Sequence, residues 1–361
     1  MKNYKIPMVP GPVKINPIAF PSLTADFGAG YSEDEFFELY KTVSEKLAQL
    51  MGTSSEVIIQ SGEAMSILWG SVKSTLLPGD TLLAISTGFF GEGFAAMACA
   101  VNARGELLAY PYDETIHDLD RIETAIKNIK PKVITAVHCE TPSGTLNPLK
   151  DLGFLKDKYQ VPLLLVDAVA SVGCTPVNGD EWHADIVMGG SQKGLSLPPT
   201  IGFCSVSERA WEIIDQVNYQ GYEAFKPFRQ LATTREHPNT PDWNGIAALN
   251  DVLDALMVTE GLPNVFARHE QVASFIRNYL TEVGYRLFPA QNAVPSPSVT
   301  CLYLPNYTTF EAFNAKVRKQ GMGIAGSFGK IEGKVFRLGH MGTQATMENA
   351  NQAVKVLESV L

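Results

Sequence analysis

The chain has 361 residues, of which 45% are hydrophobic and 19% are charged, and its formal net charge at pH 7 is −9. This length exceeds one ordinary domain and the composition can supply a large core, which excludes disordered and fibrous proteins. The net negative charge argues against nucleic acid and anionic membrane surfaces as partners.

The N-terminal part is predicted to be an extended arm followed by a helix. Residues 1–20 hold four prolines and little periodicity, which indicates an arm that packs against another part of the molecule. Residues 32–51 predict a helix, because Ser32 can cap its start, acidic residues fill its first turn and Gly52 ends it.

From residue 56 to residue 206 short apolar runs alternate with helical stretches. Seven runs predict strands, at residues 56–59, 81–85, 107–110, 133–137, 163–166, 186–188 and 201–206. The runs are continuously apolar, which is typical of strands covered on both faces. The sequence therefore predicts a large α/β domain around a mostly parallel sheet.

The C-terminal third has a different order of elements. Residues 246–283 predict long helical material that is interrupted near Gly261. A strand (299–304), a helix (308–320), two strands (323–325 and 335–339) and a last helix (346–361) follow. We therefore predict three parts: an arm (1–20), a large α/β domain (21–258) and a small α+β domain (259–361).

Three features predict a cytoplasmic protein. The most apolar window, residues 81–101, is broken by Gly88, Gly91, Glu92 and Gly93, so we expect no membrane-spanning helix. The N-terminus lacks the uninterrupted apolar stretch of a signal peptide. The five cysteines are dispersed without a Cys-x-x-Cys pair, which indicates free thiols in a reducing compartment.

Small and aromatic residues follow the first two predicted strands, where an open α/β sheet binds its ligands. Gly62, Glu63 and Ala64 precede a helix, and small residues at a helix start offer free N–H groups to a phosphate, although a tight turn needs them equally. Phe90 lies between glycines after the second strand. Its ring can stack on a planar ligand or fill the core.

An aspartate and a lysine carry the strongest chemical signal. Asp167 follows four apolar residues, where a buried carboxylate is costly unless it meets a cation. Lys193 lies among small residues after the next strand, where desolvation lowers an amine's pKa and makes it a Schiff-base nucleophile. Singly each is more often a surface residue, but the pair at successive strand ends is rare. Pyridoxal phosphate needs such a lysine, an acid beside its ring nitrogen and a phosphate cup.

Five blocks carry a resemblance to a known family: residues 60–64, 141–148, 167–173, 190–194 with Pro198-Pro199, and 333–339. With them the chain resembles the class V aminotransferases of pyridoxal-phosphate fold type I, in the alanine–glyoxylate and serine–pyruvate aminotransferase branch. The likeness runs from Pro10 to the C-terminal helix. It implies a seven-stranded, mostly parallel large domain, a small α+β domain, and a cofactor, pyridoxal 5'-phosphate.

The resemblance implies roles for the residues in the matching blocks. Lys193 and Asp167 are implied to be catalytic, as the amine that holds the cofactor and moves protons and as the partner of the ring nitrogen. The other residues implied to bind the cofactor lie beside the ring (Phe90, Thr141, Val169) or at its phosphate (Gly62, Glu63, Ala64, Gln192).

Substrate binding and assembly are implied in the same way. Arg337 resembles the residue that binds the substrate carboxylate, and Gly11 of the arm is implied to close over the substrate. Asn239 and Thr240 resemble a loop that reaches the phosphate of the neighbouring subunit. The resemblance thus implies a homodimer with shared active sites, acting on small amino acids and 2-oxo acids.

Two departures from the family pattern leave the substrates open. Glu63 places an anion in the phosphate turn, as in the similar pyridoxamine–pyruvate aminotransferase subgroup, which takes the unphosphorylated ring as substrate. That subgroup has an additional arginine where Phe328 stands, which argues against placing this chain in it. Asn239 and Thr240 suggest a loop that binds a phosphate. We therefore expect a phosphorylated cofactor and a Glu63 side chain that points away from it. The other departure is residues 27–31, where many members carry a His-Arg-Ser-Pro-like stretch.

Other functions are less well supported by the sequence. A related lyase or cysteine desulfurase stays open, but a desulfurase needs a reactive cysteine on a mobile loop, and Cys301 lies in an apolar strand. A catalytically silent binding protein fits poorly, because Lys193 and Asp167 are both present. His138 with Glu140 does not continue into a metal-ligand spacing, so we predict no metal site.

Overall fold

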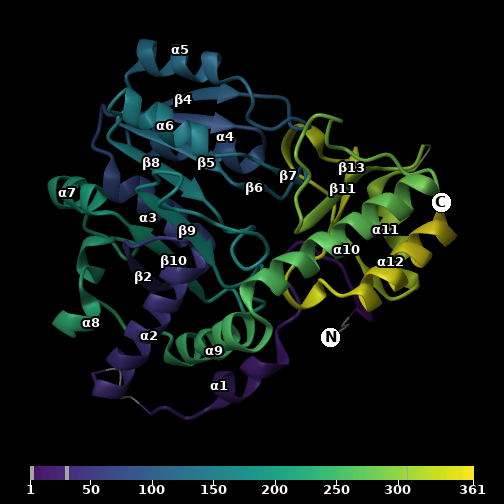
Figure 1. The fold of residues 1–361 in the computed structure, drawn as a ribbon, viewed down its shortest axis with the longest axis horizontal. Coiled ribbons are helices and arrows are strands. Elements are labelled where there is room, and N and C mark those ends of the chain that lie inside the picture. The colour runs from purple at the N-terminus through teal and green to yellow at the C-terminus, as the bar shows by residue number, and fades with distance from the viewer. Residues whose placement is uncertain (1–3, 29–31, 307) are drawn as a thin grey trace.

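A mixed seven-stranded sheet forms the centre of the computed structural model, which describes residues 4–28, 32–306 and 308–361. Its strand order is β2-β10-β9-β8-β5-β3-β4 (Figure 1). The strands are β2 (Glu56–Ser61), β3 (Thr81–Ser86), β4 (Arg104–Ala109), β5 (Val133–Val137), β8 (Leu163–Asp167), β9 (Ile186–Gly190) and β10 (Ile201–Val206). Strand β10 is antiparallel to both neighbours and the other pairs are parallel, which confirms the predicted fold class.

The continuous apolar runs became strands because both faces of the sheet are covered. Every residue of β3, β5, β8, β9 and β10 is buried. The edge strand β4 is largely exposed and begins three residues before the predicted run, with Arg104, Gly105 and Glu106 pairing with β3. Their polarity hid them from a search for buried strands, since an edge strand needs no second apolar face.

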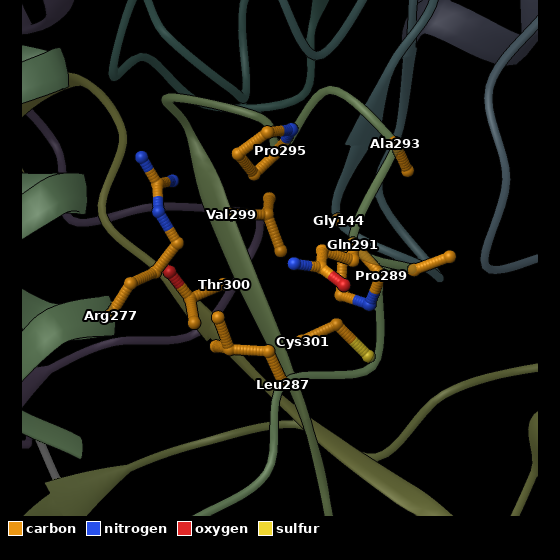
Figure 2. A pocket seen from close by; sticks show the side chains of 11 residues that line it. Gly144, Arg277, Leu287, Pro289, Gln291, Ala293, Pro295, Val299, Thr300 and Cys301 are labelled. Carbon is orange, nitrogen blue, oxygen red and sulfur yellow. The ribbon is translucent and has the colours of Figure 1, made fainter. Parts of the chain in front are cut away.

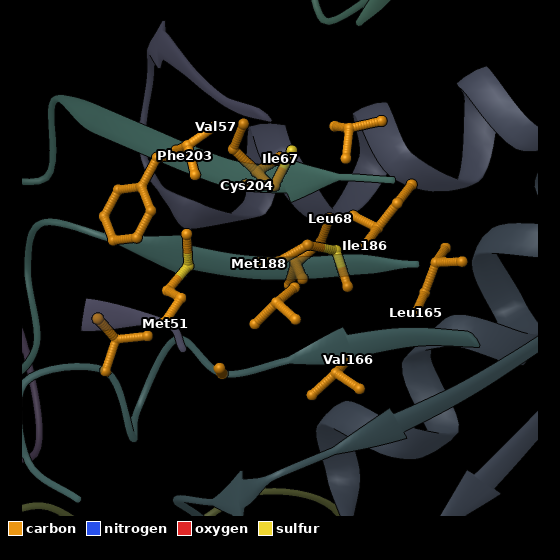
Figure 3. Packing of buried hydrophobic residues seen from close by; sticks show 14 of the residues in the cluster. Met51, Val57, Ile67, Leu68, Leu165, Val166, Ile186, Met188, Phe203 and Cys204 are labelled. Atoms are coloured by element: carbon orange, nitrogen blue, oxygen red, sulfur yellow. The ribbon is translucent and has the colours of Figure 1, made fainter. Parts of the chain in front are cut away.

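The helices of this part of the chain precede, connect or follow the sheet strands. They are α2 (Asp34–Leu50), α3 (Ala64–Thr75), α4 (Phe89–Ala100), α5 (Leu119–Ile129), α6 (Lys150–Lys158), α7 (Glu208–Val217), α8 (Leu231–Thr234) and α9 (Trp243–Asp254). Figure 3 shows how Ile67 and Leu68 of α3 pack among Met188 of β9 and Cys204 of β10. Helix α2 starts after Glu33, so the predicted cap at Ser32 is wrong, whereas Gly52, at φ +57°, follows its last turn as expected.

The N-terminal arm joins the C-terminal part of the chain. After β1 (Ile6–Pro7) the arm contains a short 3-10 helix (Pro17–Ala19) and α1 (Phe20–Thr24). Strand β1 pairs in parallel with β12 (Met322–Gly323), which identifies the segment that supports the arm. The predicted strand over residues 323–325 is therefore shorter and one residue earlier than expected.

The remaining elements form a second layer beside the sheet (Figure 1). They are α10 (Leu262–Glu282), β11 (Val299–Tyr303), α11 (Phe310–Lys319), β13 (Val335–Gly339) and α12 (Met347–Val360), with a π-helix (Ala255–Glu260) before α10 and 3-10 turns at Lys226–Phe228, Gly329–Ile331 and Gly342–Gln344. Strands β11 and β13 are antiparallel, and the short strands β6 (Cys139–Glu140) and β7 (Thr145–Leu146) form a hairpin. Gly261, at φ +82°, separates the π-helix from α10 as predicted.

Two large hydrophobic cores support the predicted division of the chain. One surrounds the seven-stranded sheet, and the other lies among α10, α11, α12, β11 and β13 and includes Ile6 and Met8 of the arm. The boundaries at residues 20 and 258 stay a prediction. Within the described ranges no helix is long and apolar enough to cross a membrane.

Candidate active site

A pocket of about 160 Å³ opens at the carboxyl ends of the sheet strands. Its lining comes from the segments that follow β2, β3, β5, β8 and β9. Eight predicted site residues lie in it: Glu63, Ala64, Phe90, Thr141, Asp167, Val169, Gln192 and Lys193. Parallel strands end at the same edge of a sheet, which is why residues up to 130 positions apart in the sequence converge here.

Lys193 is a largely buried amine whose surroundings disfavour its charge. Burial, followed by the nearby charge of Arg337, lowers the pKa of the Lys193 amine to about 8. Its Nζ donates a hydrogen bond to the carbonyl of Pro10. The amine is therefore partly neutral slightly above pH 7, which is the state that attacks a carbonyl.

Gly11 lies directly against the Lys193 side chain. A Cβ at this position would meet Lys193 Nζ at 2.6 Å, and the backbone of Gly11 has φ +105°. The φ value favours glycine, because other residues rarely adopt this conformation, and a Cβ here would also displace the Lys193 side chain. The structure thus brings the arm to the pocket, where the sequence placed it.

Asp167 is a buried carboxylate at the end of β8. Its Oδ1 accepts the N–H of Val169 at 2.9 Å. Burial raises the pKa of Asp167 to about 6, although this hydrogen bond and the charge of Lys193 act in the opposite direction. A cation bound beside it would restore its ionised state.

Glu63 faces the pocket, contrary to the expectation that it points away. Its Oε2 accepts a hydrogen bond from Gln192 Nε2 at 3.0 Å, and both residues line the pocket. Gln192 Oε1 is buried without a hydrogen-bond partner in the described part of the chain. Gly62, next to Glu63, has φ +140° and forms the turn into α3, so Ala64 begins that helix at the pocket.

Arg337 does not line this pocket, but its charge acts on Lys193. It is buried in β13, where its Nε donates to the carbonyl of Gly326 at 2.6 Å. Burial lowers the pKa of Arg337 to about 10. No carboxylate within the described residues forms an ion pair with it.

Asn239 and Thr240 lie outside the pocket of this single chain. The Oδ1 atom of Asn239 is buried and has no partner among the residues that the structure describes. Their action on a neighbouring subunit therefore stays a prediction. Of the departing stretch at residues 27–31, Phe27 stacks on Trp243 with ring centroids 5.2 Å apart, and residues 29–31 lie outside the described ranges.

Glu140, which the sequence analysis considered only as a metal ligand, does not line the pocket but supports the segment that carries Phe90. It is fully buried, and its carboxylate accepts the N–H groups of Gly91 at 2.7 Å and of Phe90 at 3.4 Å. Burial raises the pKa of Glu140 to about 8, and the charge of Asp167 adds to the rise. The signal was present, because Glu140 follows a buried strand just as Asp167 does. The residues of the pocket lining that we missed are apolar or weakly polar: Met65, Leu68, Cys139 and Ala170.

A second cavity, of about 190 Å³, lies beside β11 (Figure 2). Figure 2 shows Arg277 on one side of the strand and Gln291 and Cys301 on the other. Arg277 already donates to the carbonyl of Ser296 and to Glu270. This cavity contains none of the predicted site residues. Cys301 is fully buried in β11, and burial raises the pKa of its thiol, so it does not fit a reactive cysteine on a mobile loop.

Comparisons with known proteins agree with this geometry. A family model described as aminotransferase class-V matches residues 28–336. An uncharacterised aminotransferase of Methanocaldococcus jannaschii is 32% identical over 344 residues, which cover 94% of this chain and 88% of that protein. A pyridoxamine–pyruvate transaminase of Mesorhizobium japonicum is 30% identical over 359 residues, 94% and 87% of the two chains. The solved structure of an alanine–glyoxylate aminotransferase from Nostoc sp. has a TM-score of 0.94 and 25% identity, and covers 100% of this chain and 96% of that one.

Proposed function

This chain belongs to the class V aminotransferases, and we propose that it transfers an amino group between a small amino acid and a small 2-oxo acid with pyridoxal 5'-phosphate as cofactor. One observation carries the proposal: the Lys193 amine and the Asp167 carboxylate line one pocket, together with Phe90 and Val169. Alanine and glyoxylate as substrates are supported by the name of the Nostoc relative, and pyruvate by that of the Mesorhizobium relative, whereas serine comes from the resemblance of the sequence.

The pocket residues suit this cofactor. Pyridoxal phosphate, when bound, supplies an aldehyde that condenses with amines and a ring that withdraws electrons from the substrate. A protonated ring nitrogen would pair with Asp167 and stabilise its ionised form, which burial disfavours. Lys193, partly neutral near pH 8, would hold the cofactor and then move a proton at the substrate's α-carbon.

The substrate and the second subunit complete the proposed site. Arg337, buried and without a carboxylate partner in the described ranges, would bind the substrate's carboxylate, with Gly11 covering it. We further propose a homodimer in which Asn239 and Thr240 reach the neighbouring phosphate. All five cysteines are unpaired, which supports the cytoplasm as the compartment.

A second candidate function is favoured by Glu63. Its carboxylate lies in the turn where a phosphate would bind, and it holds the amide of Gln192. A hydroxyl group could donate to this carboxylate, whereas a phosphate would be repelled by it. The second candidate is therefore amino transfer from pyridoxamine, taken as an unphosphorylated substrate, to pyruvate; that pair is the one named for the Mesorhizobium relative.

The test of the proposal starts from protein incubated with pyridoxal phosphate. L-alanine is supplied with glyoxylate, or L-serine with glyoxylate or pyruvate, and the new amino acid and 2-oxo acid are separated by chromatography. Borohydride reduction should attach a phosphopyridoxyl mass to the peptide that contains Lys193. Lys193→Ala should lose both the label and multiple turnover, whereas Lys150→Ala, at an exposed ion pair with Glu181, should keep both. Wild-type turnover in Lys193→Ala would contradict the proposal.

A further inference from the structure

We propose that Phe328 and Phe89 form an aromatic wall beside Arg337 that restricts the site to substrates with one carboxylate. The inference rests on the proposed function, because it takes Arg337 as the group that binds the substrate's carboxylate. It adds the residues that select the rest of the substrate.

Three aromatic rings lead from Arg337 to the pocket. The guanidinium of Arg337 lies 4.9 Å from the centre of the Phe328 ring, close enough for a cation–π contact. The Phe328 and Phe89 rings are 5.5 Å apart, and the Phe89 and Phe90 rings are 5.6 Å apart. Phe90 itself lines the pocket. The rings therefore form a continuous series of contacts from Arg337 to Phe90 of the pocket lining.

The segment that carries Phe328 is held against the large sheet domain. Ser327, on one side of Phe328, donates its hydroxyl to the carbonyl of Pro142 at 2.8 Å. Lys330, two residues beyond Phe328, forms an ion pair with Glu92 of α4. These contacts come from both sides of Phe328 and fix the position of its ring.

Phe89 is held in the same way, at the start of α4. A Cβ at Gly329 would lie 3.2 Å from the Phe89 ring, so this glycine lets the two segments approach closely. Phe89 and Phe328 are nevertheless 42% and 45% exposed. Such exposure of two neighbouring phenylalanines leaves apolar surface for a ligand to cover.

The charges around the wall disfavour a second carboxylate. Lys193 is the cationic residue of the described pocket lining, and Arg337 is the cation that acts on it. Lys330, the next cation along the chain, is already paired with Glu92. A distal carboxylate that packs against these rings would lose water without gaining a partner from them, and desolvating an unpaired carboxylate is unfavourable.

The inference concerns which 2-oxo acids react, so the experiment compares kcat/KM across a series. Glyoxylate, pyruvate and 2-oxobutyrate have one carboxylate; oxaloacetate and 2-oxoglutarate have two. For the wild type we expect kcat/KM for pyruvate to exceed that for either dicarboxylate by about 100-fold, the scale on which a pocket that cannot pair a charged group discriminates.

Two variants place the selectivity on Phe328. Phe328→Arg should raise kcat/KM for oxaloacetate or 2-oxoglutarate, relative to that for pyruvate, by about 10-fold or more, because it replaces aromatic surface by a cation that can pair with a second carboxylate. Phe328→Leu keeps the wall apolar, so it should leave the dicarboxylates poor. Phe154→Leu, at a similarly exposed phenylalanine on α6, is the matched control. It should leave kcat/KM unchanged for pyruvate and for the dicarboxylates.

Binding without turnover gives a second measurement. Propionate and glutarate are titrated against the cofactor-loaded protein, with the cofactor's absorbance as the signal. We expect propionate to bind more tightly to the wild type and Phe328→Arg to reverse the order. The proposal of an aromatic wall would be contradicted if the wild type used pyruvate and 2-oxoglutarate with equal kcat/KM. It would also be contradicted if Phe328→Arg left the ratio of these two kcat/KM values unchanged. Loss of all transamination with every 2-oxo acid would instead contradict the proposed function.

Discussion

Replacing Glu63 by glutamine tests whether the pocket prefers a pyridine ring with or without its phosphate group. In the wild type a carboxylate oxygen of Glu63 lies 3.0 Å from Gln192 Nε2, at the start of α3. Glutamine has nearly the same size and can keep a hydrogen bond to Gln192. The substitution therefore removes the charge and little else.

The expected magnitude follows from Coulomb's law. A unit charge 4 Å from the carboxylate costs about 4 kcal/mol at an effective dielectric constant of 20, and a phosphate carries roughly 1.5 to 2 charges. The N-terminus of α3 offsets about 1 to 2 kcal/mol of this repulsion. The net repulsion is about 4 to 7 kcal/mol, and screening by solvent and salt reduces it, so we expect at least a 100-fold effect on affinity, or about 3 kcal/mol.

The assay is a titration of cofactor-free protein with pyridoxal and with pyridoxal phosphate, followed by absorbance. Glu63→Gln should raise the preference for the phosphorylated ring about 100-fold over the wild type. Glu45→Gln, at an exposed glutamate on α2, should leave the preference unchanged. An unchanged ratio in Glu63→Gln would show that the carboxylate leaves the pocket when the ring binds, and would refute the reasoning. The preference of the wild type decides between the two candidate functions.

Three more predictions test the rest of the site. Asp167→Asn should keep the cofactor bound but slow single-turnover transamination by about 10³-fold, since the ring nitrogen loses its anionic partner; a rate within a few-fold of the wild type would show that another group protonates the ring. Mixing Thr240→Ala with Lys193→Ala subunits should restore some activity, because a hybrid dimer has one intact site, and an active monomer at assay concentration would contradict this arrangement. The pKa of Glu140 is raised from 4.5 to about 8, so the folded protein binds an extra proton between these values and should lose stability as the pH rises through them. Thermal unfolding of the cofactor-free protein should show a weaker fall over this range in Glu140→Gln, and an identical pH profile would count against the burial of this carboxylate.

The sequence predicted the central sheet well because burial on both faces demands continuous apolar residues. The sequence did not predict the start of β4, because this edge strand is exposed and does not need continuous apolar residues. It also missed the partner of the arm, since the pairing of β1 with β12 joins segments about 315 residues apart. No local pattern records such a contact.

The same division holds for the candidate site. Asp167 and Lys193 were identifiable from sequence because each polar residue interrupts apolar or small neighbours at a strand end, and the parallel sheet brings such ends together. The direction of the Glu63 side chain and the stacking of Phe328 on Arg337 depend on which side chains other segments place nearby. Only the tertiary structure decided them, because the contacts that orient a side chain come from residues distant in the sequence.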